Sequence, residues 1–321
     1  MKLQGWLGEH WRVLATRLQR NELPHAVLIC GDAGLGKRSL ANALASAALC
    51  EARQADGHAC GICKSCQLLT AGSHPDHILV GFEARDDGKL RSEITVEQIR
   101  QLSQRLSLST QYGGLQIVII DPADKMNTSA ANALLKTLEE PSASTVIVLV
   151  SDHPAHLSAT IRSRCQRIEL KVPERARAME WLVEQGISIE LAEQALESAL
   201  GNPGEALGAI SNEVLGLRGE CARDLLELNT ARTSALTVAD AWAADRPAER
   251  LWHAAVIARD EALRLADGKP GKLGLTGAGE IPKLAAWFAA ANRSRELLNT
   301  QLRSELVVLD LLHAWQMPRR P

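Results

Sequence analysis

Apolar residues recur along the first half of the chain in two alternating patterns. Continuous apolar runs at 26–30, 115–120 and 145–150 have the length and composition of buried strands. Between these runs, residues 39–49 and 127–138 carry apolar residues at helical spacing. Because strands alternate with helices, the pattern predicts a parallel sheet with helices packed on its faces.

The pattern changes after a last short strand predicted at 168–170. Beyond Val172-Pro173 the chain is rich in Ala, Leu, Glu and Arg, and turn-forming glycines and prolines interrupt it at 201–204 and 268–271. The predicted fold class is therefore α/β followed by all-α. The predicted domains are an α/β domain at 1–170, a small helical domain at 171–210 and a larger helical domain at 211–321.

Composition and charge argue against a protein that binds nucleic acid or membranes through its overall charge. The chain has 321 residues with 36 Lys+Arg against 38 Asp+Glu, a formal net charge of -2. Such a balance gives no overall attraction to nucleic acid or anionic lipid, so any contact with DNA must come from local patches or partner chains. We expect a cytoplasmic protein, because the start of the chain lacks the apolar core of a signal peptide and no run is long enough to span a membrane.

The segment after the first predicted strand nearly matches the phosphate-binding P-loop pattern G-x-x-x-x-G-K-[ST]. Gly31, Gly34 and Gly36 would let backbone N–H groups wrap phosphates, and Lys37 would neutralise their charge. Arg38 stands where the pattern needs the hydroxyl that binds magnesium, so we expect no magnesium and only weak binding of ATP or ADP. A glycine turn that never binds nucleotide is the alternative, and it stays open.

An acid closes the second predicted strand, as in nucleotide-hydrolysing enzymes. Asp121 is in place to hold metal, but Pro122 occupies the position of the acid that would polarise water, and Asp124 lies two residues further on. The alternative is that Asp121 merely caps the turn into the next helix.

Four cysteines gather in one short stretch, residues 50–66. Cys60, Cys63 and Cys66 have C-x2-C-x2-C spacing, and Cys50 precedes them. This spacing is typical of a structural zinc site with four protein ligands, and buried or redox-active thiols are the alternative. Three nearby histidines are interpreted as loop residues rather than ligands: His58, His74 and His77.

Arg164 lies in the string Ser163-Arg164-Cys165 after the third predicted strand. A guanidinium is planar and permanently charged, which suits it to stabilise the charge that develops on a transferring phosphate of a neighbouring subunit. An arginine beside Arg162 and Arg167 is ordinarily solvated or salt-bridged, so the local sequence leaves both readings open.

Several segments together resemble a known family. They are Leu23-Pro24-His25-Ala26, the loop at Gly31–Lys37, the four-cysteine insert, the string NALLKTLEEP at Asn132–Pro141, and Ser163-Arg164-Cys165. In combination they are similar to the AAA+ subunits of the bacterial sliding-clamp loader of DNA polymerase III. Because the nucleotide machinery is damaged, the resemblance is to the delta-prime type of subunit. It is dense over the first two predicted domains and looser beyond them.

The resemblance implies an AAA+ P-loop (RecA-like) domain, a small helical lid and a helical collar domain that joins loader subunits in a ring. It implies that Arg164 acts as an arginine finger in trans, on ATP held by a gamma/tau subunit. The other implied partners are the delta subunit, the sliding clamp and primed DNA, the last through the assembled complex. It also implies that Ser151 occupies the first sensor position and that Gly204 replaces the arginine of the lid sensor.

Three phosphate-handling positions are thus altered, at Arg38, Pro122 and Gly204, so we expect no ATP hydrolysis by the chain alone. The leading hypothesis is a non-hydrolysing component of the polymerase holoenzyme that completes a neighbour's ATP site. One alternative is an active gamma/tau-type clamp-loader ATPase. Another is a zinc-dependent docking module.

Overall fold

The computed structural model describes residues 3–84, 88–108, 110–112, 114–142, 144–211, 215–275, 277–298 and 300–316. The chain divides into two compact units, Met1–Ile187 with Gly201–Glu205, and Ser188–Leu200 with Ala206–Pro321. Each unit has a hydrophobic core of its own. The predicted order, α/β followed by all-α, is confirmed, whereas the three-part boundaries at 170 and 210 stay a prediction.

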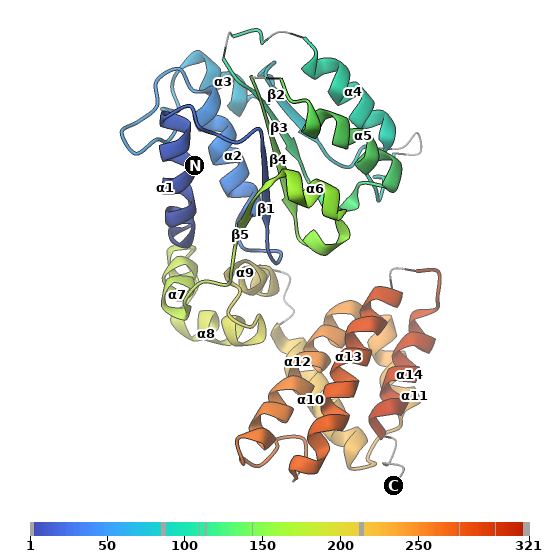
Figure 1. The fold of residues 1–321 in the computed structure, drawn as a ribbon. Helices are drawn as coiled ribbons and strands as arrows, with labels where there is room; N and C mark the ends of the chain where they lie inside the picture. The colour runs from blue at the N-terminus through green and yellow to red at the C-terminus, as the bar shows by residue number, and fades with distance from the viewer. Residues whose placement is uncertain are drawn as a thin grey trace. The chain divides into compact units, whose positions relative to one another are not determined.

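The first unit is built on a five-stranded parallel sheet with strand order β2-β3-β4-β1-β5 (Figure 1). The strands are β1 (Ala26–Cys30), β2 (His77–Val80), β3 (Gln116–Ile120), β4 (Thr145–Ser151) and β5 (Gln166–Glu169). The runs predicted at 26–30, 115–120 and 145–150 are the three inner strands, which are buried at every position because helices cover both faces. The last strand begins two residues earlier than predicted, at Gln166.

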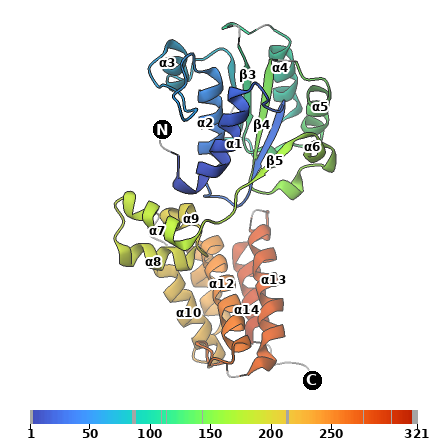
Figure 2. The same ribbon diagram turned by 60° about the vertical axis from the view of Figure 1, so that its left-hand side comes forward.

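Helices pack on both faces of this sheet (Figures 1 and 2). α1 (Gly8–Gln19) and α2 (Lys37–Leu49) cover one face, and α4 (Val96–Leu106), α5 (Thr128–Glu139) and α6 (Ala159–Arg164) cover the other. The remaining elements of the unit are η1 (Gly5–Leu7), α3 (Lys64–Thr70), η2 (Ala123–Lys125), η3 (Pro154–His156) and α7 (Arg175–Glu184). The carboxyl ends of the strands therefore meet at one edge of the sheet, where the loops after β1, β3 and β4 begin.

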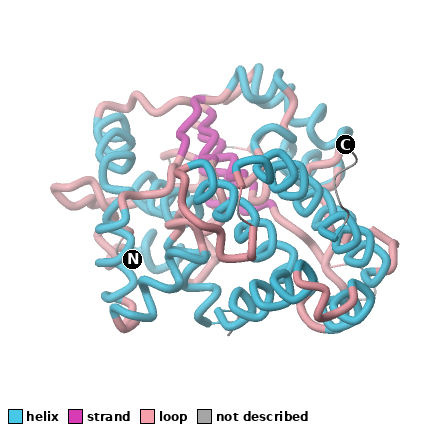
Figure 3. Tube along the Cα trace, turned by 90° about the horizontal axis from the view of Figure 1, so that it is seen from below, coloured by secondary structure: helices cyan, strands magenta, loops and turns pink. Residues whose placement is uncertain are grey.

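The described residues of the second unit form helices, and the magenta strands of Figure 3 gather in one sheet. Its elements are α8 (Ile189–Ser198), α10 (Leu215–Asn229), α11 (Ala235–Ala244), α12 (Pro247–Ala266), η4 (Ala278–Glu280), α13 (Ile281–Leu297) and α14 (Ser304–Gln316), with α9 (Pro203–Ser211) starting in the first unit. Trp242, Trp287 and Trp315 lie in its core, and their indole N–H groups all donate hydrogen bonds. None of the described helices is long and apolar enough to cross a bilayer.

Candidate functional site: a degenerate phosphate loop, a partly exposed arginine and a cysteine cluster

The phosphate-loop segment connects β1 to the N-terminus of α2, as the sequence predicts. Gly31, Gly34 and Gly36 all have positive φ, at 136°, 79° and 89°, a backbone region that favours glycine. Helix α2 begins at Lys37, immediately after left-handed Gly36. The strand–loop–helix context of a P-loop is therefore present, with the loop at the carboxyl edge of the sheet.

Lys37 is turned onto the loop itself. Its ammonium donates to the carbonyl of Gly31 at 2.7 Å and to the carbonyl of Asp32, and it forms an ion pair with Asp152 at 2.6 Å. Only 4% of the side chain is exposed. Because an ammonium has three donors, these partners occupy all of its hydrogen-bonding capacity.

Arg38 pairs with the acid that closes β3. Its Nη2 donates to Asp121 Oδ1 at 3.1 Å and its Nε to Asp121 Oδ2, a bidentate arrangement that raises the pKa of the guanidinium, chiefly through the hydrogen bond to Asp121. Magnesium requires oxygen ligands in near-octahedral geometry. The Asp121 carboxylate already carries the Arg38 guanidinium, and position 38 offers no hydroxyl. These residues therefore do not fit a magnesium ion.

Asp124 and Ser151, the two other residues singled out at this edge of the sheet, are both buried. Asp124 is buried and accepts a hydrogen bond from the backbone N–H of Asp152 at 3.2 Å. Ser151 ends β4 beside Cys30 of β1, and its Oγ is buried without a hydrogen-bond partner among the described residues. The sequence had singled out Ser151 but missed Asp152, the residue that pairs with Lys37.

Arg164 lies in the last turn of α6, a helix whose N-terminus is capped by Ser158 Oγ. Its Nη2 forms an ion pair with Glu139 Oε1 at the end of α5 at 2.6 Å, and its Nη1 donates to the carbonyl of Thr160 at 3.1 Å. The side chain is 35% exposed. The guanidinium is thus held in one orientation and remains accessible from outside the chain.

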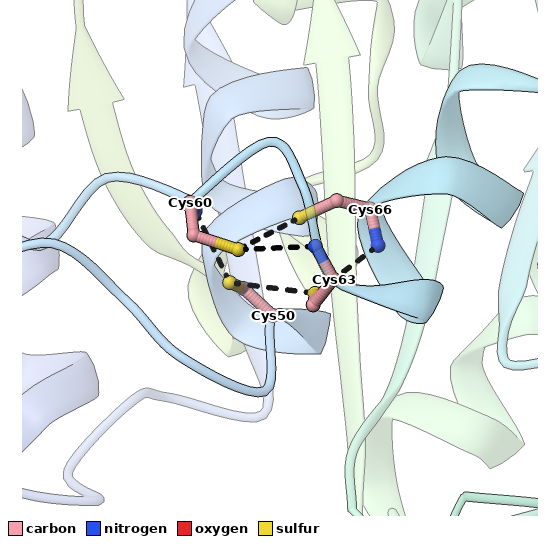
Figure 4. A group of neighbouring side chains, drawn as sticks. All are labelled: Cys50, Cys60, Cys63 and Cys66. Atoms are coloured by element: carbon pink, nitrogen blue, oxygen red, sulfur yellow. Dashed lines mark hydrogen bonds between the residues drawn. The ribbon is translucent and has the colours of Figure 1, made fainter.

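The four cysteines come together (Figure 4). The sulfur atoms of Cys50, Cys60, Cys63 and Cys66 all lie within 4.8 Å of one another, with 4.0 Å between Cys50 and Cys63 and 4.0 Å between Cys60 and Cys66. Tetrahedral zinc with Zn–S bonds of about 2.3 Å places its sulfurs about 3.8 Å apart. Four thiols at this spacing therefore fit a closed tetrahedral metal site.

Backbone N–H groups donate hydrogen bonds to three of these sulfurs. Cys60 N–H donates to Cys50 Sγ at 3.2 Å, and the N–H groups of Cys63 and Cys66 donate to Cys60 Sγ and Cys63 Sγ at 3.4 Å. Hydrogen bonds from Ile62 and Cys63 lower the pKa of Cys60 to about 6, whereas burial raises the pKa of Cys66 to about 12. The donor set suits a metal ion that binds thiolates.

The histidines near the cluster lie outside it. His74 Nε2 lies 2.8 Å from the hydroxyl of Ser65, which donates to the Leu49 carbonyl at 2.5 Å, so the imidazole is the donor of that pair. His58 stacks on Trp11 with 4.3 Å between ring centroids. The prediction that all three are loop residues is wrong for His77, which begins β2. β2 and α3 were not predicted at all.

A parallel sheet with a P-loop after β1, followed by a helical unit, places the chain in the AAA+ fold class. Its sequence matches the family described as DNA polymerase III, delta subunit, over residues 7–174. Curated relatives specify the branch: the chain is 39% identical to DNA polymerase III subunit delta′ of Pseudomonas aeruginosa over 74% of its length. It is 41% identical to the Haemophilus influenzae subunit over 63% of its length and 35% identical to that of Escherichia coli over 66%.

The chain belongs to the DNA polymerase III delta′ subunit family. The matched segments span 70%, 59% and 62% of these three relatives, in the same order. The resemblance stated from the motifs is thereby confirmed at the level of the family.

Proposed function

We propose that this chain is a non-hydrolysing subunit of the clamp loader of DNA polymerase III and that Arg164 completes the ATP site of a neighbouring gamma/tau-type subunit. The chain then assists loading of the sliding clamp on primed DNA through the assembled complex with delta and gamma/tau. We propose that the protein acts in the cytoplasm.

The proposal rests on the ion pairs and positions of three basic side chains, Lys37, Arg38 and Arg164. Lys37 and Arg38, which would serve a nucleotide bound by this chain, are paired with Asp152 and Asp121. Arg164 is also ion-paired, with Glu139, but it lies at the end of α6, where it is 35% exposed and where Glu139 and the Thr160 carbonyl fix its direction. A guanidinium fixed before the nucleotide arrives loses little side-chain entropy on binding phosphate, which suits an arginine finger.

The test is a loader reconstituted with Arg164→Ala, compared with Arg162→Ala. Arg162 is an exposed arginine on the same helix, so its variant controls for loss of surface charge. Arginine fingers contribute about 10³–10⁵ in rate at one site. We expect Arg164→Ala to lower DNA-stimulated ATP hydrolysis and clamp loading at least about tenfold, with assembly unchanged. Equal activity of the two variants would remove the finger role.

Arg164→Lys refines the test, because lysine keeps the charge but loses the planar fork. We expect it to leave subunit assembly unchanged and to recover hydrolysis only in part. The rival function, an active gamma/tau-type ATPase, predicts magnesium-dependent ATP turnover by the isolated chain that Lys37→Ala abolishes. The bidentate pair of Arg38 with Asp121 argues against that rival.

We also propose that the four cysteines hold a structural zinc ion. The ligand set is complete without water, so the site offers no open position for catalysis. If the insert were instead a zinc-dependent docking module, removing zinc would abolish one binding event and leave the stability of the sheet unit unchanged. A structural ion gives the opposite result, which is loss of stability in that unit.

A further inference from the structure

The turn at residues 201–205 lies directly against the phosphate loop within the first unit. Asn202, only 5% exposed, donates from Nδ2 to the carbonyl of Ala33 at 2.7 Å. Its Oδ1 accepts from the backbone N–H groups of Gly204 at 3.1 Å and Glu205 at 3.2 Å. One buried amide side chain therefore caps the start of α9 and ties it to the loop.

The two backbones approach too closely for any side chain between them. A Cβ on Gly204 would overlap the carbonyl oxygen of Gly34 and lie 2.5 Å from its Cα. A Cβ on Gly34 would lie 2.8 Å from the backbone nitrogen of Glu205. The resemblance places an arginine of active relatives at position 204, and no arginine fits there while the turn is seated.

The charges of the loop are already balanced by the chain itself. Asp152 neutralises Lys37 and Asp121 neutralises Arg38. A triphosphate would have to displace both carboxylates, and those carboxylates would repel it once released. It would also have to compete with the Gly31 and Asp32 carbonyls for the ammonium of Lys37.

We propose that this loop is self-occupied: the Asp152 carboxylate takes the place that a phosphate has beside the lysine of an active site, the Arg38 guanidinium takes the place of the metal ion beside Asp121, and the loop serves as a fixed seat for the turn 201–205. Nucleotide is excluded, and the turn stays seated without one. The proposal concerns the chain's own loop, so it stands or falls separately from the role of Arg164.

The first test is binding of ATP to the full chain by equilibrium dialysis, with and without magnesium. We expect no binding up to about 1 mM, the weak end of the affinity scale. Saturable binding of ATP below that concentration would overturn the proposal. The double variant Arg38→Ser with Asp152→Asn removes the charged partners of Asp121 and Lys37, and we expect it to gain magnesium-dependent binding. If this variant binds no better than the wild-type chain, the ion pairs are not what excludes nucleotide.

The second test is hydrogen exchange of the full chain at residues 31–37 and 201–205. Gly204→Ala should speed exchange of both segments at least about tenfold, because the turn cannot stay seated, and tenfold corresponds to one order in the opening equilibrium. Gly208→Ala on the same helix is the matched control, since a Cβ at Gly208 meets nothing within 4 Å. Should Gly204→Ala fail to fold, Asn202→Ala removes the hydrogen bonds without a clash and should have the same effect. Unchanged exchange would overturn the proposal.

Discussion

Replacing Lys37 by methionine separates a structural lysine from a phosphate-binding one. Methionine keeps an unbranched apolar side chain along the buried path but removes the ammonium. The two loop carbonyls and Asp152 then lose the donor that they share.

The expected magnitude follows from burial. Removing one partner of a buried ion pair costs about 3–5 kcal/mol. Asp152 is 30% exposed and recovers part of its hydration, so we expect the sheet unit to lose about 2–4 kcal/mol. That loss corresponds to about 30-fold to 1,000-fold in the opening equilibrium.

The assay is native-state hydrogen exchange of strands β1 and β4, which reports on the sheet unit and is not confused by unfolding of the helical unit. Lys136→Met, at an exposed position of α5, is the control and should leave exchange unchanged. If Lys37→Met changes exchange no more than the control does, the lysine is not a structural element of this loop, and the reasoning from its three contacts is wrong.

Two further predictions concern the metal site and pH. Removing zinc with a chelator, or replacing Cys63 by serine, should lower the melting temperature of the sheet unit and leave that of the helical unit in place; calorimetry checks this, and a chain purified without about one zinc ion per molecule would contradict it. In the helical unit, burial, with Arg218 nearby, lowers the pKa of His253 to about 4. Because the unfolded chain binds that proton from about pH 6.5 downward, we expect stability to be full above that pH and to fall by up to about 3 kcal/mol toward pH 4. Urea unfolding at both pH values measures this loss, and His253→Gln should remove it.

The sequence predicts the inner strands well because each is a continuous apolar run that must be buried on both faces. β2 was not predicted because it has only four residues and lies at the sheet edge, where Leu79 is exposed between the buried Ile78 and Val80. α3 was not predicted because Cys63 and Cys66 of the cysteine cluster lie at its start, and their spacing is typical of a turn.

The loop residues were found from sequence, but their partners were not. The pair between Lys37 and Asp152 joins positions far apart in the chain, and the register that sets Cys30 beside Ser151 brings them together. The pair between Arg38 and Asp121 likewise depends on how the strands align. An acid directly after a buried strand at the carboxyl edge was the available signal for Asp152. Without strand order, nothing in the sequence assigns it to Lys37.

The most direct measurement is a structure of the assembled loader with a non-hydrolysable ATP analogue. The account predicts that the guanidinium of Arg164 lies within about 3 Å of a γ-phosphate oxygen of the analogue held by the adjacent subunit. It also predicts that the loop at 31–37 holds no nucleotide and keeps Lys37 on Asp152. An analogue bound in this chain's own loop, with Arg164 facing solvent, would contradict the account.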